Sequence, residues 1–173
     1  MAYQHRIKRR VEFSETDMAG IVHFSNFFRY MEAAEHEFFR SLGYSVVLKD
    51  FDPPLGLPRV HAECDYLQPL RFEDEVEIQL LVTEKRRRTL SYRFHFWKTD
   101  GGRRIEVARG RLTVVCVMHH PDGSLKATSL PQAVADQLEV APPEMLASSA
   151  APPPQPERPP SGCSTLNADP AHA

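Results

Sequence analysis

The sequence lacks any long apolar run. No stretch approaches the roughly 20 consecutive apolar residues that a membrane-spanning helix requires, so we expect no membrane insertion. Residues 1–10 include several basic side chains, but the apolar segment that a secretory signal contains does not follow them. These two absences predict a cytoplasmic protein.

Cysteine is also scarce. Cys64, Cys116 and Cys163 are widely spaced, odd in number and form no Cys-x-x-Cys pair, which argues against a disulfide framework and a cysteine zinc site. We expect Cys64 and Cys116, which lie in strand-like runs, to be reduced core residues. His119 and His120 lack the spacing and the acidic partners of a metal site, so the sequence predicts no bound metal.

The chain carries little net charge. Its 21 Lys and Arg residues nearly balance its 23 Asp and Glu residues, and the formal net charge of -2 does not indicate a nucleic-acid partner. Of the 173 residues, 42% are hydrophobic and 25% are charged, and no internal repeat is visible. These values are typical of one globular domain that is large enough to bury a core.

One segment has a clear helical pattern. Its apolar residues recur at spacings of three and four: Phe27, Tyr30, Met31, Ala34, Phe38 and Leu42. This spacing predicts an amphipathic helix of four to five turns. Ser25 or Asn26 is suited to cap its start, and Gly43 is suited to end it. A strand over residues 4–13 precedes this helix.

The rest of the folded region has strand patterns. Apolar and polar residues alternate, or run nearly apolar, over 60–66, 76–82, 90–97 and 105–118. Residues 100–102, Asp-Gly-Gly, indicate a hairpin, and a short helix is expected over 132–138. A strand, a long helix and four further strands predict an α+β fold in which one long helix packs on a five-stranded antiparallel sheet.

The composition changes at about residue 141. Residues 141–173 contain nine of the 15 prolines, and aliphatic residues are almost absent there. Such a segment cannot bury enough apolar surface to offset its ordering entropy. We therefore expect one folded domain over residues 1–140 and a disordered tail, rich in proline and alanine, over residues 141–173. A role for this tail as a proline-rich ligand stays open.

The turn before the helix carries the main candidate for chemistry. Asp17 lies in it, Gly20 follows, and the helix begins a few residues later. The positive end of a helix favours negative charge and can polarise a carbonyl oxygen. A carboxylate beside it can act as a nucleophile or a general base. Aspartate is also common in turns for purely structural reasons, so both roles stay open at this point.

The segment over residues 15–22, Glu-Thr-Asp-Met-Ala-Gly-Ile-Val, resembles the signature of the 4-hydroxybenzoyl-CoA thioesterase family. The resemblance covers roughly residues 3–138 and includes Asn26, Tyr30, Glu32-Ala33-Ala34, Gly56-Leu57-Pro58 and Arg86-Arg87-Arg88. It implies the hotdog fold, in which a five-stranded antiparallel sheet wraps one long helix. It also implies homo-oligomers: dimers that join their sheets and often assemble into tetramers, with active sites at the dimer interface.

The resemblance also implies roles for individual residues. Asp17 corresponds to the catalytic carboxylate of the family, and Phe24 supplies the backbone N–H that polarises the carbonyl. His23 either polarises or positions the substrate, or packs at the start of the helix against the neighbouring subunit, and both roles stay open. Glu32 is expected either to line the acyl pocket or to tie the helix to the partner chain.

A basic cluster follows the third expected strand. The simplest interpretation is a solvated turn that contains Arg86, Arg87 and Arg88. A single basic cluster is weak evidence for a nucleic-acid-binding surface. Coenzyme A, however, carries a 3′-phosphate and a pyrophosphate, for which arginine is a suitable ligand. In the family resembled, basic residues at this turn bind the nucleotide. Coenzyme A is then part of the substrate, and no separate cofactor is implied.

The resulting hypothesis is an enzyme that hydrolyses an acyl-CoA thioester to a free acid and coenzyme A. A hotdog dehydratase or hydratase is one alternative, although Asp17 and His23 are not arranged as in the Asp-x-Asn-Pro-x-His motif of those enzymes. A non-catalytic module that binds acyl thioesters is another. The sequence leaves the acyl group open between aromatic and short or medium fatty acyl chains.

Overall fold

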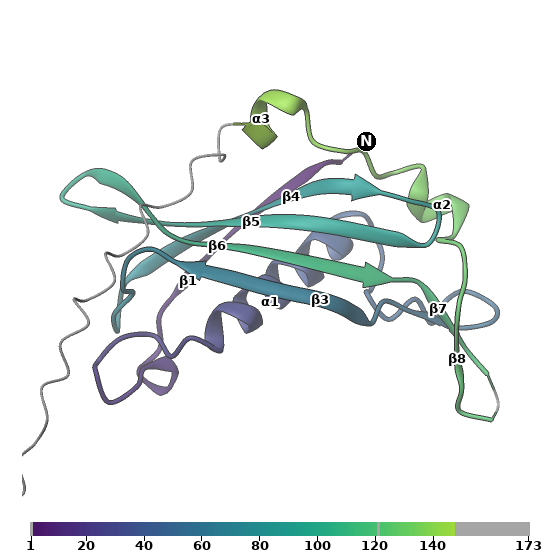
Figure 1. Cartoon of the computed structure of the whole chain (residues 1–173), viewed down its shortest axis with the longest axis horizontal. Coiled ribbons are helices and arrows are strands. Elements are labelled where there is room, and N and C mark those ends of the chain that lie inside the picture. The colour runs from purple at the N-terminus through teal and green to yellow at the C-terminus, as the bar shows by residue number, and fades with distance from the viewer. Residues whose placement is uncertain (1, 121, 148–173) are drawn as a thin grey trace, which may run out of the picture.

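The computed structural model describes residues 2–120 and 122–147. Its central element is a five-stranded sheet in the order β1-β4-β5-β6-β3, and every neighbouring pair is antiparallel. The strands are β1 (Gln4–Arg10), β3 (Arg59–Tyr66), β4 (Glu75–Lys85), β5 (Thr89–Asp100) and β6 (Arg103–Val115). One long helix, α1 (Asn26–Ser41), lies across one face of this sheet (Figure 1). The predicted α+β architecture is confirmed.

Helix α1 forms because its apolar residues fall on one face. Phe27, Tyr30, Met31, Ala34 and Phe38 are buried against the sheet, as their spacing predicts. The inward side chains of β4 and β5 alternate with outward ones and complete the core; they include Val76, Ile78, Leu80, Tyr92, Phe94 and Phe96. Full burial of each large apolar side chain stabilises the fold by about 1.5–3 kcal/mol.

Two expected elements are shorter than predicted. The first strand ends at Arg10, because residues 12–15 turn instead into the 3₁₀ helix η1 (Phe13–Glu15), in which the Glu12 N–H donates to Glu15 Oε2 at 2.8 Å. The helix expected over 132–138 is α2 (Gln132–Ala135). Lys85 Nζ donates to the carbonyls of Ala135, the last residue of α2, and of Leu138.

The last expected strand, 105–118, is divided. β6 ends at Val115, although the Cys116 N–H still donates to Arg88 O, the residue opposite it in the β5–β6 register. Beyond it, β7 (Val117–His119) turns into a second, three-stranded sheet with β2 (Leu55–Gly56) and β8 (Leu125–Ala127). The sequence patterns did not indicate this small sheet, because two of its strands are too short to show a period. Cys116 is a buried free thiol and Cys64 a half-buried one.

The chain beyond residue 140 continues against the outer face of the large sheet. The Ala141 N–H donates to Val82 O at 2.8 Å, and the short helix α3 (Pro143–Ala147) follows. Arg93 of β5 donates to Leu146 O at 2.7 Å. Residues 141–147, which the sequence assigned to the tail, thus lie on the sheet (Figure 1). The remainder of the predicted tail, residues 148–173 with Cys163, lies outside the described residues.

Gly110 sets how closely α1 approaches the sheet. It lies in the middle of β6 and faces the helix, and a Cβ built on it would lie 2.2 Å from Met31 Sδ. We predict that Gly110→Ala lowers the free energy of unfolding by about 1–3 kcal/mol, because the buried methionine must move. Chemical denaturation checks this.

A double-mutant cycle separates the steric clash from the loss of glycine itself. In a Met31→Ala background, which frees the space over β6, Gly110→Ala should cost clearly less than in the wild type. Equal costs in the two backgrounds would contradict the role of this contact.

Candidate active site

Asp17 is held in a tight turn between η1 and α1. Its Oδ1 accepts the Ala19 N–H at 2.8 Å and, at the long limit of 3.5 Å, the Ile21 N–H. Gly20 has a φ of 72°, and its N–H donates to Asp17 O at 2.9 Å. Glycine is suited to this left-handed position because it has no Cβ. No described residue hydrogen-bonds to Asp17 Oδ2, so one carboxylate oxygen is used by the turn and the other is available.

Glu15 ties this turn to the helix. Its backbone carbonyl accepts bonds from the His23 N–H at 2.9 Å and from Asn26 Nδ2 at 2.7 Å. Its side chain accepts the Tyr30 hydroxyl proton at 2.7 Å. Burial, with the Glu15 hydrogen bond, raises the pKa of Tyr30 well above its usual value, so Tyr30 stays a neutral donor. These bonds fix the position of Asp17 relative to the first turn of α1.

Asp17 and Phe24 line the same cavity. It has a volume of about 540 Å³, and its other lining residues come from the same turn, α1 and the segment after β3: Ile21, Val22, Phe27, Tyr66, Leu67, Gln68, Pro69 and Leu70. The Phe24 N–H has no acceptor among the described residues, and it lies just before the helix, where backbone N–H groups are left free. The cavity therefore combines a carboxylate, a free N–H and apolar walls.

Tyr66 is a component of this cavity that the sequence patterns did not reveal. Its hydroxyl donates to Phe24 O at 3.2 Å, and its ring packs edge-on against Phe27. The side chain is nevertheless 47% exposed, as is 59% of Phe24. The alternation of β3 explains Tyr66 as an ordinary strand residue, so only the fold shows that it reaches the start of α1.

His23 lies beside this cavity but is not among its lining residues. Its Nδ1 is 2.9 Å from Ser25 Oγ, and its ring packs against Phe24 with centroids 4.4 Å apart. No described carboxylate pairs with it. The structure thus places His23 as a residue that packs and hydrogen-bonds at the start of α1.

Glu32 lies in a different cavity, about 510 Å³ in volume, at the other end of β3. Glu32 Oε1 is 3.3 Å from Arg59 Nη2, which also donates to Glu35 Oε2 at 2.7 Å. Glu35 is only 1% exposed. Burial raises its pKa to about 7, with Arg59 opposing and Glu32 adding to the shift. Sequence patterns did not single out Glu35, because a charged residue on a helix is ordinarily solvated.

The three arginines lie far from Asp17 within one chain. The carbonyls of Arg87 and Arg88 accept the N–H groups of Leu130 and Cys116, so the turn lies beyond the far end of β6. Asp17 lies toward the other end of β6. It lines the same cavity as Leu67, whose N–H donates to Val107 O of that strand. At about 3.3 Å per residue, the strand from Val107 to Val115 is about 26 Å long. Figure 1 shows the β4–β5 turn and the loop before α1 at opposite ends of the sheet.

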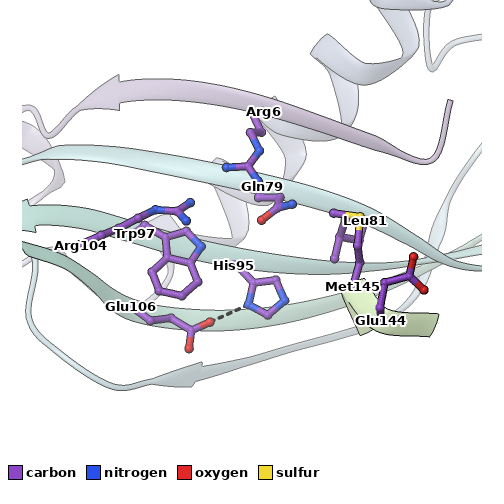
Figure 2. A pocket seen from close by; sticks show the side chains of 9 residues that line it. All are labelled: Arg6, Gln79, Leu81, His95, Trp97, Arg104, Glu106, Glu144 and Met145. Atoms are coloured by element: carbon purple, nitrogen blue, oxygen red, sulfur yellow. Dashed lines mark hydrogen bonds and ion pairs between the residues drawn. The ribbon is translucent and has the colours of Figure 1, made fainter. Parts of the chain in front are cut away.

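A further cavity of about 400 Å³ lies on the outer face of the large sheet, away from α1 (Figure 2). In it His95 Nδ1 is 2.6 Å from Glu106 Oε1, whose other oxygen accepts from Arg109. Burial lowers the pKa of His95 despite this contact. Figure 2 shows Glu144 of α3 at the side of the cavity. Among the residues that the structure describes, no serine, threonine or cysteine lines it.

Other classes of site receive no support from the described part of the chain. Among residues 2–120 and 122–147, no group of three or more His, Cys, Asp or Glu side chains is arranged to hold a metal ion. Nor does any helix in these ranges combine the length and the apolar character that crossing a membrane requires.

Comparison with known proteins agrees with this geometry. The family model of the thioesterase-like superfamily matches residues 11–138. A protein from Aquifex aeolicus (strain VF5), provisionally named an esterase, is 37% identical over 132 residues, which cover 76% of this chain and 95% of that one. The 4-hydroxybenzoyl-CoA thioesterase of Pseudomonas sp. (strain CBS-3) is 27% identical over 81% of this chain and 99% of its own length.

Solved structures show the same likeness. The crystal structure of that Pseudomonas enzyme superposes with a TM-score of 0.68 at 26% identity, over 78% of this chain and 99% of that one. A gentisyl-coenzyme A thioesterase superposes with a TM-score of 0.64 at 31% identity, over 76% of this chain and 99% of that one. The fold is therefore the predicted hotdog fold, and the chain belongs to the thioesterase-like superfamily, as an acyl-CoA thioesterase of the 4-hydroxybenzoyl-CoA thioesterase family.

Proposed function

We propose that this enzyme hydrolyses its acyl-CoA substrate with Asp17 as the catalytic carboxylate and the Phe24 N–H as the carbonyl-polarising group. The observation that carries the proposal is the shared cavity of Asp17 and the free N–H before α1. The thioester carbonyl oxygen accepts the Phe24 N–H, and the positive end of the helix stabilises the charge that develops on it. One such donor contributes about 10²–10³ in rate.

The chemistry needs only groups that the cavity contains. The free oxygen of Asp17 either attacks the carbonyl carbon to form an acyl anhydride or takes a proton from the attacking water. In both routes the C–S bond breaks and coenzyme A leaves as a thiolate, which is a good leaving group because thiol pKa values lie near 8.5. Water supplies the second carboxylate oxygen of the product. No metal or separate cofactor takes part in either route.

The turn between β4 and β5 that carries Arg86, Arg87 and Arg88 is called the arginine turn below. Its distance from Asp17 supports a site that two chains form together. Within the described part of the chain, β3 is an edge strand that pairs only with β6. Its residues are mostly exposed, including Val60 at 61%. The other edge, β1, carries alternating Arg and Lys side chains, which protect an edge from pairing. We therefore infer a dimer in which the two β3 strands pair antiparallel about a two-fold axis.

This pairing completes the active site. Arg59 begins β3 at the arginine-turn end, and Tyr66 ends it at the Asp17 end. An antiparallel pair of β3 strands sets the Arg59 end of one chain beside the Tyr66 end of the other. The arginine turn of one chain thus approaches Asp17 of its partner, where Arg86, Arg87 and Arg88 contact the phosphates of coenzyme A. Assembly of dimers into a homotetramer and a cytoplasmic location remain predictions.

The hydratase alternative is less well supported. It requires a histidine that can exchange protons with the substrate, but His23 contacts Ser25 and Phe24 and does not line the cavity of Asp17.

We predict that Asp17→Asn keeps the fold and lowers kcat/KM at least about 100-fold, because the amide can neither attack nor accept the proton. Release of free thiol from a panel of acyl-CoA esters measures this. The control is Asp50→Asn, an exposed aspartate in the loop before β2. Undiminished turnover in Asp17→Asn would rule out the assignment.

For Arg88→Ala, we expect KM for an acyl-CoA to rise about tenfold with little change in kcat, because one phosphate contact is lost. Arg88 is the best choice of the three, since Arg86 pairs with Glu84 and Arg87 donates to Ser129. An acylpantetheine, which lacks the nucleotide, should be unaffected. Arg10→Ala on β1 is the control, and an equal effect on both substrates would argue against phosphate binding.

Mixing two impaired variants, assayed at acyl-CoA concentrations well below KM, tests whether two chains share a site. We expect dimers formed from an Asp17→Asn chain and a chain with Arg86, Arg87 and Arg88 all changed to Ala to contain one intact site, and random mixing then restores about a quarter of wild-type activity. A site built within one chain would give no recovery at all.

A further inference from the structure

The backbone of Phe24 is held by hydrogen bonds on both of its sides. The peptide group that carries the Phe24 N–H also contains the carbonyl of His23, which accepts the Asn26 N–H at 2.9 Å. In the next peptide group, the Phe24 carbonyl accepts the Tyr66 hydroxyl proton at 3.2 Å and the Phe27 N–H at 3.3 Å. The free N–H therefore belongs to a residue whose two peptide groups are both restrained, the second one partly by a side chain from β3.

Tyr66 is itself anchored to rigid parts of the fold. It is the last residue of β3 and pairs with Ala108 of β6. Its ring packs edge-on against Phe27 with the ring centroids 5.2 Å apart, and Phe27 is 3% exposed and packs in turn on Phe96 of β5. A side chain that is supported by a strand and by the core can define the position of the group that its hydroxyl binds.

The Tyr66 hydroxyl is a donor at physiological pH. Burial, with Cys64 adding to the shift, raises the pKa of Tyr66 to about 12. The neutral hydroxyl has one proton to donate, and its acceptor is Phe24 O. A phenol with such a pKa is also a weak acid for a departing thiolate, so the bond to Phe24 defines the role of this hydroxyl better than proton transfer does.

The direction of the Phe24 N–H is important because charge develops on the thioester oxygen only as the carbonyl carbon is attacked. A donor that already points at this oxygen stabilises the charge without reorganising during the reaction. Groups in a reactive site must keep their geometry within about 0.5 Å and 10–20°. The two peptide groups that flank Phe24 are joined by only the two rotatable bonds of this residue, so restraining both groups fixes the N–H.

We propose that Tyr66 is a positioning residue for hydrolysis: its hydroxyl, by holding the Phe24 carbonyl, aims the Phe24 N–H at the thioester oxygen. This inference rests on the proposed function, because it requires that the N–H polarises the carbonyl. Tyr66 acts through Phe24 and does not bind the reacting atoms. Its ring separately forms part of the apolar wall of the Asp17 cavity.

Two substitutions separate the hydroxyl of Tyr66 from its ring. Tyr66→Phe removes only the hydroxyl, and we expect kcat to fall about five- to tenfold while KM stays within about twofold. Tyr66→Leu also removes the ring and should raise KM as well, because the cavity wall changes. Thiol release from the acyl-CoA ester that the wild type hydrolyses fastest measures both constants.

Tyr44→Phe is the matched control for the loss of a hydroxyl. The Tyr44 hydroxyl accepts Gln137 Nε2 at 3.3 Å, and Tyr44 lies just beyond the C-terminal end of α1, whereas Phe24 lies just before its start. We expect Tyr44→Phe to leave kcat and KM unchanged. An equal fall of kcat in Tyr44→Phe and Tyr66→Phe would overturn the role of Tyr66.

The stretching frequency of the thioester carbonyl gives a readout that a purely structural tyrosine would not alter. The same ester, isotope-labelled at this carbonyl carbon, is bound to the Asp17→Asn variant and observed by difference infrared spectroscopy. We expect its band to lie at a lower frequency than that of the free ester, because the Phe24 N–H draws charge onto the oxygen. Adding Tyr66→Phe to this variant should make the shift smaller, and adding Tyr44→Phe should not.

These measurements separate failure of this proposal from failure of the catalytic assignment. Wild-type kcat in Tyr66→Phe, with an unchanged carbonyl shift, would overturn the role of Tyr66 and leave the assignment of Asp17 and Phe24 intact. Full activity of Asp17→Asn would overturn the role of Asp17 alone, since a lower kcat in Tyr66→Phe would still support the positioning of Phe24. A bound ester without any carbonyl shift would overturn the role of the Phe24 N–H, and that of Tyr66 with it.

Discussion

The packing of α1 on the inner face of the sheet is the interaction on which the rest of this structure depends. The helix approaches β6 closely because Gly110 leaves room for Met31, and it buries a continuous apolar face. The turn that carries Asp17 has little core of its own. It is positioned by bonds from Glu15 to Asn26 and Tyr30 of that helix. The Asp17 carboxylate and the free N–H of Phe24 therefore keep their relative positions only while α1 stays packed on the sheet.

The length of the sheet separates Asp17 from the basic turn, and in the proposed mechanism one substrate molecule contacts both. Within one chain, Asp17 lies near Val107 of β6 and the basic turn lies beyond Val115, and the strand between these two residues is about 26 Å long. Coenzyme A thioesters are long molecules with charge at one end and the reactive bond at the other. The dimer proposed through the exposed strand β3 brings the two ends together, and the edge of the sheet is then part of the proposed active site.

Two acidic groups on opposite faces of the sheet, Glu35 buried and Glu106 half-buried, differ in how many of their hydrogen bonds are made. Glu106, on the outer face, has both oxygens occupied, one by His95 and one by Arg109. Glu35, on the inner side, has one oxygen occupied and one free. Burying a charged group is unfavourable unless its hydrogen bonds are made.

The sequence by itself determined the helix, the order of the strands and the carboxylate turn. These follow from local spacing, because the apolar period of residues 27–42 and the position of Gly20 express the conformation of their own segment. Only the tertiary structure decided that Phe24 and Tyr66 meet, that Arg59 reaches Glu35, and that Arg88 lies far from Asp17. It also gave the small sheet and the course of residues 141–147. Contacts between distant segments depend on how the sheet is ordered and how closely the helix packs, and no periodicity within one segment encodes them.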